Sequence, residues 1–473
     1  MSIRRDIAWQ RQDRLQRSSL AYQYADYALG LNYALLPAEV VHQAKRILLD
    51  TLGCAIGGYD SPGRPMCEGV VGDLGGVPEA TVIGSGLRTN ATNANLVNCF
   101  LVRFLDFNDL SAGGHNSDSL PSLLAIAERQ KANGRDFLTA LVTCYELAER
   151  VNVGITNWHG LLGETRASLI VPPAIGPMMG MNADQIAHAI GIAACGNATL
   201  GILDVPGEEK PMRKNFRFGW GASSAIVASL FAKRGFTGPL RVFEGEKGLK
   251  EVLLRGEADI EAMTDFRGWR TMNAHFKYLC AVVTSHGVLQ ATLEIVREND
   301  LKPEDIAEVR LKMNPGASTL RPTTPALYPR NAETADHSAY YLAAVAIKDR
   351  EVTADSIRPE KFTDPVILDL VEKIRIDGDP SIPPMPKVKY VSSIGMQGSA
   401  EIATVDGRRF QRTVVIPHGF WGGPTLTDRE LEEKFTALAA KHLNKQRIQD
   451  LFQAVWNLEK IDDIGKLMKL TVF

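Results

Sequence analysis

Apolar residues recur at helical spacing through most of the first half of the chain. Pro37 opens one such segment and Gly57-Gly58 ends it, and its apolar face carries Val40, Val41, Ala44, Ile47, Leu48 and Leu52. Residues 137–151 keep the same pattern, Asn182 caps the start of a further helix, and a helix rich in small residues over 222–234 ends at Gly235. These segments predict one large helical domain over residues 1–268.

The pattern changes near Thr271. A helix is expected over 281–298, and residues 306–313 end in the alternation of a strand. Two β-prone runs flank Asp406-Gly407, a pair that tolerates the positive φ angles of a hairpin turn. The sequence therefore predicts a mainly α fold with an α+β part. A smaller α+β lid domain (269–404) is inserted into a helical domain built from both chain ends, 1–268 and 405–473.

Amino-acid composition excludes some classes of binding partner. The 473 residues carry 53 Lys and Arg against 55 Asp and Glu, which gives a net charge of −2. This balance provides no basic surface for nucleic acid or an anionic membrane, and no apolar run approaches the ~20 residues of a membrane span. The start of the chain lacks the apolar core of a secretory signal. We expect a cytoplasmic enzyme that binds a small molecule.

Six cysteines stand singly along the chain, without any Cys-x-x-Cys pair. Paired spacing is typical of zinc and iron–sulfur sites, so the sequence predicts no such centre. Single cysteines in a long chain are instead typical of buried apolar positions in a reducing compartment.

The densest group of polar residues lies in the loop 106–118. It holds Asp106, Asp109, His115 and Asp118 together with a Gly113-Gly114 hinge. Carboxylates and a histidine on one loop can supply an acid/base pair, whereas the spacing of familiar metal-ligand motifs is absent. The alternative is structural: Asp118 caps the next helix, which is expected over 120–130, and the other side chains satisfy backbone groups.

Three further positions stand out, each with a structural alternative. His159 precedes a glycine-containing loop, where a lone histidine is more often structural than catalytic. Lys214 and Arg213 belong to a short basic run before a helix start, which suits either an anion or a solvated charged face. Tyr341 could donate a hydrogen bond to an oxygen, although a helical tyrosine is usually part of the core.

Four ordered blocks of the chain resemble the MmgE/PrpD family, which contains 2-methylcitrate dehydratase, cis-aconitate decarboxylase and related lyases of small acids. Residues 48–58 resemble the family's early helix with its Asp-Thr-Leu-Gly core, and residues 106–117 resemble its Asp-Phe-Asp-Asp and His-Pro-Ser loop. Residues 231–240 and 333–341 are similar to two later blocks, the last being close to the dehydratase branch. Leu110, Asn116 and Arg103 depart from the family pattern.

The resemblance implies a homodimer with no metal or organic cofactor, acting on a di- or tricarboxylic acid. The expected reaction is loss of water from a β-hydroxy carboxylate, as in propionate catabolism. The alternatives are decarboxylation or isomerisation on the same scaffold, and a homologue that binds small acids without catalysis. Family catalytic and binding positions carry over onto Asp106, His115, His159, Lys214, Lys277 and Tyr341.

Roles follow from the chemistry of removing a weakly acidic proton α to a carboxylate. Positive charge must hold the carboxylate as its electrons become enolate-like. The substrate-binding set is Lys214, Lys277, Arg213 and Arg103. Histidine titrates near pH ~6.5 and can carry a proton in either direction, so the expected catalytic set is His115 and His159 as proton carriers, Asp106 as base or orienting group, and Tyr341 as donor to the leaving oxygen.

Overall fold

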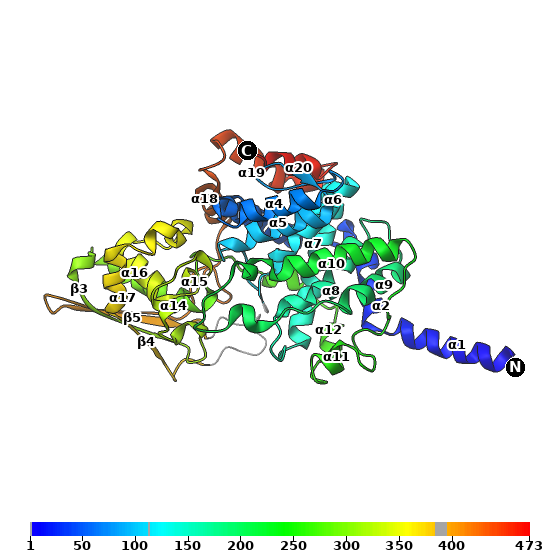
Figure 1. Ribbon diagram of the computed structural model, residues 1–473, viewed down its shortest axis with the longest axis horizontal. Helices are drawn as coiled ribbons and strands as arrows, with labels where there is room; N and C mark the ends of the chain where they lie inside the picture. The colour runs from blue at the N-terminus through cyan, green and yellow to red at the C-terminus, as the bar shows by residue number, and fades with distance from the viewer. Residues whose placement is uncertain (1, 112–113, 384–394) are drawn as a thin grey trace.

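The computed structural model describes residues 2–111, 114–383 and 395–473. Figure 1 shows two parts side by side, a larger helical body and a smaller part that contains the sheet. The first helix, α1 (Ser2–Arg17), projects from the body, and the C-terminus lies on the body's upper side. None of the helices in the described ranges is both long and apolar enough to cross a membrane.

The helical body is built around α3, which is buried along almost its whole length. It packs against α5 and α7 and, from the other end of the chain, against α18. The main helices of the body are α2 (Leu20–Gly30), α3 (Ala38–Gly57), α4 (Arg64–Leu74), α5 (Ala91–Phe104), α6 (Leu120–Gln130), α7 (Gly134–Gly154), α8 (Ala167–Ile175), α9 (Ala183–Ala194) and α10 (Arg217–Lys233).

Local sequence signals explain where these helices begin. Asn182 and Gln185 form the capping box of α9, and Asn133 caps α7. The predicted helix over 222–234 starts earlier, at Arg217, because a 3-10 turn over Met212–Phe216 leads directly into it. Arg217 is therefore the first residue of α10.

The smaller part contains a four-stranded sheet in the order β4-β3-β5-β6. Its strands are β3 (Ile306–Met313), β4 (Ile374–Gly378), β5 (Gly398–Thr404) and β6 (Arg409–Val414). β3 pairs parallel to β4 and antiparallel to β5, and β5 forms a hairpin with β6. On one side, α13 (His286–Glu298) contacts β5 and β6, and α16 (Ala339–Asp349) contacts α13.

The hairpin turn contains Asp406 and Gly407, and Gly407 has a φ of 92°. The mainly α fold with an α+β part and the hairpin are thus as the sequence predicts. Two boundaries differ. The helix expected from residue 281 begins at His286, after a 3-10 turn. The expected domain limit at 404 falls inside the β5–β6 hairpin, so the α+β part includes β6, because the two strands share one ladder.

The C-terminal helices α18 (Asp428–Ala439), α19 (Lys445–Trp456) and α20 (Gly465–Leu470) return to the helical body. Lys434 of α18 lies 2.7 Å from the buried carboxylate of Asp50 on α3. Near the start of α7, the Gly134 N–H donates to the Ile461 carbonyl at 2.8 Å. A Cβ added at Gly134 would lie 1.7 Å from the Leu458 carbonyl oxygen, so only glycine allows this approach.

We expect Gly134→Ala to lower the free energy of unfolding by about 1–3 kcal/mol, because backbone on both sides must move apart. Chemical or thermal denaturation of the purified protein measures the change. Gly69→Ala is the matched control, since no atom lies within 4 Å of a Cβ built there and alanine favours a helix. Equal stability of the two variants would contradict the close packing of the chain ends.

Candidate active site

A cavity of about 290 Å³ lies between the helical body and the α+β part. This volume suits a small metabolite rather than a large cofactor. Its walls come from the end of α5, the loop after it, the first residue of α10 and the segment that leads into α13. The charged and histidine side chains on the wall are Arg103, Asp106, His115, Glu164, Asp204, Arg217, His275, Lys277 and His337.

Asp106 is the centre of one wall. It follows α5 in a left-handed backbone conformation with φ 47°, which is uncommon for a residue other than glycine. Its buried carboxylate forms an ion pair with Arg103 and lies 2.8 Å from Lys277 Nζ. Burial alone would raise the pKa of Asp106, but Arg103 and Lys277 outweigh it and hold that pKa well below its usual range. Asp106 therefore stays ionised and is a weak base.

Lys277 ties this wall to the α+β part. Its ammonium donates to the Asp106 carbonyl at 2.6 Å, to the Asp106 carboxylate at 2.8 Å and to the Ala281 carbonyl at 3.0 Å. These three contacts use all three N–H donors of a lysine. Lys277 thus fixes Asp106 in place rather than presenting a spare donor to the cavity.

His115 lies beside Asp106, but its surroundings favour the uncharged form of its side chain. Its Nε2 is 3.4 Å from Asp106 Oδ1. Burial lowers the pKa of His115 well below 6.5, and Arg103 and Lys277 lower it further against the opposing effect of Asp106. The ring is therefore neutral near pH 7. A proton on the nitrogen that faces Asp106 leaves Nδ1 as the basic nitrogen, and Nδ1 has no hydrogen-bond partner among the described residues.

Arg217, at the start of α10, is the centre of a second group of charges on the cavity wall. Its Nε lies 3.1 Å from Glu164 Oε1, and its Nη1 lies 3.1 Å from Asp204 Oδ2. Burial opposes the charge on Arg217, but the two carboxylates outweigh burial and raise its pKa. The guanidinium is thus held in one orientation by acidic groups from two separate 3-10 turns, Gly163–Arg166 and Gly201–Asp204.

His337 is one of the three histidines that line the cavity, with His115 and His275. Its Nδ1 contacts the carboxylate of Asp336, and its Nε2 lies 3.6 Å from Asp204 Oδ1. The ring therefore lies between two carboxylates, in direct contact with that of Asp336. Lys214 is fully buried, and its Nζ lies 2.9 Å from Asp336 Oδ2. Lys214 therefore positions Asp336 and, through it, His337.

Oxygen and nitrogen atoms of Asp106, Asp336 and His337 lie within 4.8 Å of one another, close enough to hold a metal ion. Each carboxylate of this group is already neutralised by buried cations, Lys277 and Arg103 at Asp106 and Lys214 at Asp336. A metal would have to displace these ammonium and guanidinium groups. The donor set therefore fits a network of ion pairs better than a metal centre.

Four of the residues singled out in the sequence, Arg103, Asp106, His115 and Lys277, meet on this cavity. His159 does not line it. The His159 ring is largely buried, has Nε2 3.0 Å from the exposed Glu257 carboxylate, and sits at a φ of 47° in its own loop. The His159 imidazole thus contacts Glu257 and not the residues that line the cavity.

Tyr341, Arg213 and Lys214 also lie off the cavity wall. The Tyr341 hydroxyl donates to the Ser356 carbonyl at 2.8 Å, inside the α+β part, so it is not directed at a substrate. The Arg213 guanidinium lies 5.7 Å from the ring centre of the exposed Trp220. Tyr341, Arg213 and Lys214 are therefore not among the residues that line the cavity, whereas His337 and Arg217 are.

Glu164, Asp204, Arg217, His275 and His337 are the wall residues that the sequence analysis did not select. Two of them had a local signal. Arg217 ends the same basic run as Lys214, and His337 directly follows Asp336 in the block that resembles the family. Glu164, Asp204 and His275 had none, because only the packing of separate loops brings them to the cavity. Burial lowers the pKa of His275 to about 4.

The loop 106–118 lines the cavity with Asp106 and His115, and other polar side chains of the loop bond within the protein. Asp118 is not the cap of the next helix, because Ser119 is the N-cap residue of α6 and no side chain caps it. Asn116, a departure from the family pattern, donates to Ser111 at 2.6 Å and to Glu149 at 2.8 Å and accepts from Arg166. Leu110 pairs its backbone with His275, N–H to carbonyl at 2.9 Å. Of the expected hinge, Gly113 lies outside the described residues, and Gly114 lines the cavity with a φ of 137°.

Comparison with known proteins agrees with this architecture. The MmgE/PrpD N-terminal domain matches residues 22–261, and the MmgE/PrpD C-terminal domain matches residues 280–458. The chain is 25% identical to human cis-aconitate decarboxylase, over 96% of this chain and 94% of the relative. It is 23% identical to a cis-aconitate decarboxylase-like protein of Aspergillus oryzae, over 97% and 98%. It is 25% identical to 2-methylcitrate dehydratase of Salmonella typhimurium, over 90% and 92%. With both family domains matched in order along the chain, the protein belongs to the MmgE/PrpD family.

Proposed function

We propose that this protein is a lyase that removes water from a small β-hydroxy carboxylic acid without a metal or organic cofactor. The observation that carries the proposal is a neutral, buried histidine, His115, which lines the cavity beside fixed positive charge and whose Nδ1 has no hydrogen-bond partner among the described residues. A proton α to a carboxylate is weakly acidic, so its removal needs a positioned base and a nearby cation. The relatives' names, dehydratase and decarboxylase, support the same class of reaction.

In the proposed reaction, His115 Nδ1 accepts the α-proton. The electron pair of the broken C–H bond forms the new C=C bond, and the C–O bond to the β-hydroxyl breaks. His337 supplies the proton with which that hydroxyl leaves as water. Arg103 and Arg217, both on the cavity wall, hold the carboxylate whose charge grows during proton removal.

Asp106 and Asp336 act by positioning in this scheme. Asp106 fixes the ring orientation of His115, and Asp336 does the same for His337. Lys277 and Lys214 keep these carboxylates in place from behind. Decarboxylation is the second candidate, because several relatives are named cis-aconitate decarboxylases and a histidine that removes a proton can also return one to a carbanion.

A panel of small hydroxy acids and unsaturated acids tests both reactions. Growth of alkene absorbance from a hydroxy acid supports dehydration, and release of carbon dioxide supports decarboxylation. Turnover of 2-methylcitrate in this panel is the result expected for a role in propionate catabolism. No turnover of any acid, by a protein that binds one of them, would favour a binding function over catalysis.

We also propose that the chain forms a homodimer in the cytoplasm. Two exposed rows of apolar side chains support an association surface on the helical body: Met66, Val70 and Leu74 on α4, and Trp220, Val227 and Phe231 on α10. The cysteines are unpaired, as in a reducing compartment. Light scattering during gel filtration tests the dimer, and Val70→Glu with Trp220→Glu should shift the mass toward that of one chain. A monomeric wild-type protein would contradict it.

The pH dependence of turnover should identify His115 as the base. The base works only when neutral, and its pKa is lowered, so activity is present above that lowered pKa and falls as the pH drops through it. We therefore expect the acidic limb of the kcat/KM profile to lie below pH 6.5. His115→Gln should remove this limb and reduce kcat on the order of 10²-fold or more.

His42→Gln is the control for this experiment, because His42 is a half-exposed histidine on α3, away from the cavity wall. It should leave both the rate and the profile unchanged. His159→Gln tests whether residues outside the cavity take part in catalysis. A loss of kcat as large as that of His115→Gln would show that the cavity does not contain the whole active site. An unaltered acidic limb in His115→Gln would assign the base to another group.

Exhaustive chelation should leave turnover unchanged. The three groups that could hold a metal, Asp106, Asp336 and His337, are already engaged with buried cations or with one another. Rates are measured before and after dialysis against a chelator, and again after addition of magnesium, manganese, iron or zinc. A loss that one of these ions restores would replace the proposed ion-pair network with a metal centre.

A further inference from the structure

His115, the proposed base, is held only loosely through its own side chain. Its Nε2 lies 3.4 Å from Asp106 Oδ1, beyond the length of an ordinary hydrogen bond, and its Nδ1 has no hydrogen-bond partner among the described residues. The position of the ring in the cavity therefore depends on the backbone that leads into and out of His115. The side chain of the next residue, Asn116, fixes that backbone.

The Asn116 amide is buried and has a partner for each of its polar atoms. Nδ2 donates to Ser111 Oγ at 2.6 Å and to Glu149 Oε1 at 2.8 Å, and Oδ1 accepts from Arg166 Nη2 at 2.9 Å. Both N–H donors of the amide are thus used. Leaving such buried groups without partners costs free energy, so these bonds hold the amide in one orientation.

Two of these partners belong to the core of the helical body. Glu149 is a buried residue of α7, and Arg166 is fully buried at the end of the 3-10 turn Gly163–Arg166. The Arg166 guanidinium lies 5.8 Å from the ring centre of Phe218 on α10. Asn116 therefore ties the backbone next to His115 to elements that do not belong to the loop.

The third partner, Ser111, precedes His115 in the loop. Its backbone exchanges hydrogen bonds with that of Gly114, at 3.0 and 3.2 Å. The bond from Asn116 to Ser111 thus joins the two ends of the segment that contains His115. We call the bonds of Asn116 to Ser111, Glu149 and Arg166 the Asn116 clasp. The His-Pro-Ser loop of the family has proline at this position, and proline carries no amide side chain that could make these bonds.

We infer that Asn116 is a positioning residue for His115, and that the Asn116 clasp holds the imidazole beside Asp106 on the cavity wall. This inference rests on the proposed function, in which His115 removes the α-proton. A base acts only at the right distance and angle from the proton, and a displacement of about 1 Å can lower the rate about 10²-fold. The clasp supplies this geometric constraint, which the contacts of the His115 ring do not supply.

Asn116→Ala removes the clasp and leaves the His115 side chain unchanged. We expect kcat to fall at least about tenfold, because the base is no longer held in place. KM should change less than about twofold, because Arg103 and Arg217 still hold the substrate carboxylate. Steady-state kinetics on an acid that the wild-type protein turns over measures both constants.

Asn98→Ala is the matched control. Asn98 is also buried, donates to the Thr81 carbonyl at 2.9 Å and accepts from the Ile83 N–H at 2.8 Å, and it does not line the cavity. Its loss should lower the stability of the protein and leave kcat unchanged. Asn116→Pro is the second variant if Asn116→Ala does not fold, since proline suits the first position of a helical turn. An unchanged kcat in the Asn116 variants would overturn the inference.

Titration of the His115 ring provides a readout that needs no turnover. In protein labelled with carbon-13 at the histidine Cε1 positions, the His115 signal is the one that His115→Gln removes. Burial, Arg103 and Lys277 lower the pKa of His115, so the wild-type ring should titrate well below pH 6.5. Without the clasp, water reaches the ring and weakens the effect of burial, so the midpoint in Asn116→Ala should rise by about 1 pH unit or more. A midpoint equal to that of the wild type would overturn the inference.

The two readouts separate this inference from the proposed function. A raised midpoint in Asn116→Ala, in a protein that turns over none of the acids, would preserve the clasp and overturn the lyase. Turnover by the wild type, with kcat and midpoint unchanged in Asn116→Ala, would preserve the lyase and overturn the clasp. A raised midpoint together with a lower kcat supports both.

Discussion

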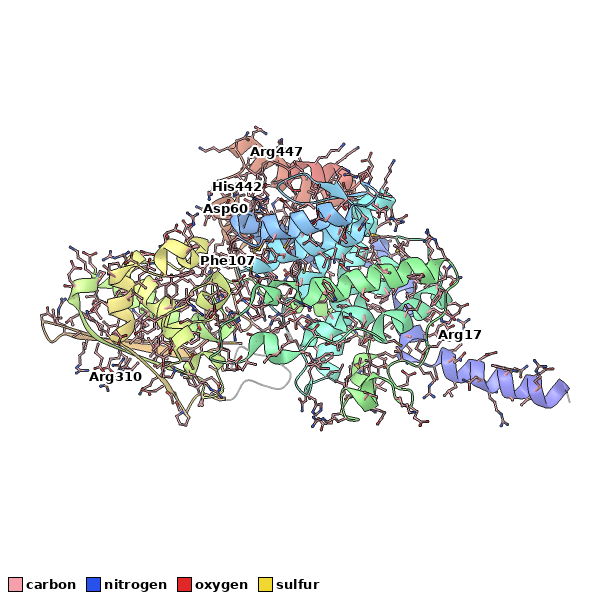
Figure 2. All side chains as sticks on the ribbon, viewed as in Figure 1. Arg17, Asp60, Phe107, Arg310, His442 and Arg447 are labelled. Atoms are coloured by element: carbon pink, nitrogen blue, oxygen red, sulfur yellow. The ribbon has the colours of Figure 1, made fainter. Side chains whose placement is uncertain are left out.

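The buried carboxylate of Asp106 is the constraint on which the site depends. A charge removed from water must be paired, and here Arg103 from α5 and Lys277 from the segment before α13 supply the pairs. Lys434 of α18 extends the connection by donating to the carbonyls of Phe107 and Lys277 at 2.7 and 3.0 Å. Figure 2 labels Phe107 where the helical body meets the α+β part. One buried acid thus joins the early helices, the α+β part and the C-terminal helices, and the cavity opens beside it.

This arrangement sets the protonation states of the site before any substrate binds. The cations that hold Asp106 ionised also act on His115, where they oppose its protonation together with burial. The same positive charges therefore keep Asp106 ionised and weakly basic, and they keep His115 uncharged and able to accept a proton. In the same loop, burial raises the pKa of Asp118 to about 6 and that of Asp109 to about 7, so these two carboxyls ionise closer to neutral pH than exposed carboxyls do.

Much of the fold could be predicted from local patterns, because caps, apolar spacing and the Asp406-Gly407 turn act over short stretches of chain. The polar loop after α5 could also be found, since its composition is unusual for a buried segment. The remaining site residues depend on contacts between distant segments. Lys214 and Tyr341 carry groups that could contact a substrate. The Lys214 ammonium is instead paired with Asp336, and the Tyr341 hydroxyl donates to the Ser356 carbonyl. Glu164 and Asp204 lie on two separate loops, and both contact Arg217 at the cavity.

The difference between lysine and arginine explains how one cavity can be both firmly built and able to bind an anion. An ammonium group has three donors, and in Lys277 the protein uses all of them, so that residue contributes rigidity alone. A guanidinium group has five donors, and Arg103 and Arg217 face their acidic partners through Nε and Nη1. Arg103 therefore both pairs with the buried Asp106 carboxylate and lines the cavity. A change at this one position would therefore alter both the charge of the cavity wall and the pKa of Asp106, which the positive charge of Arg103 lowers.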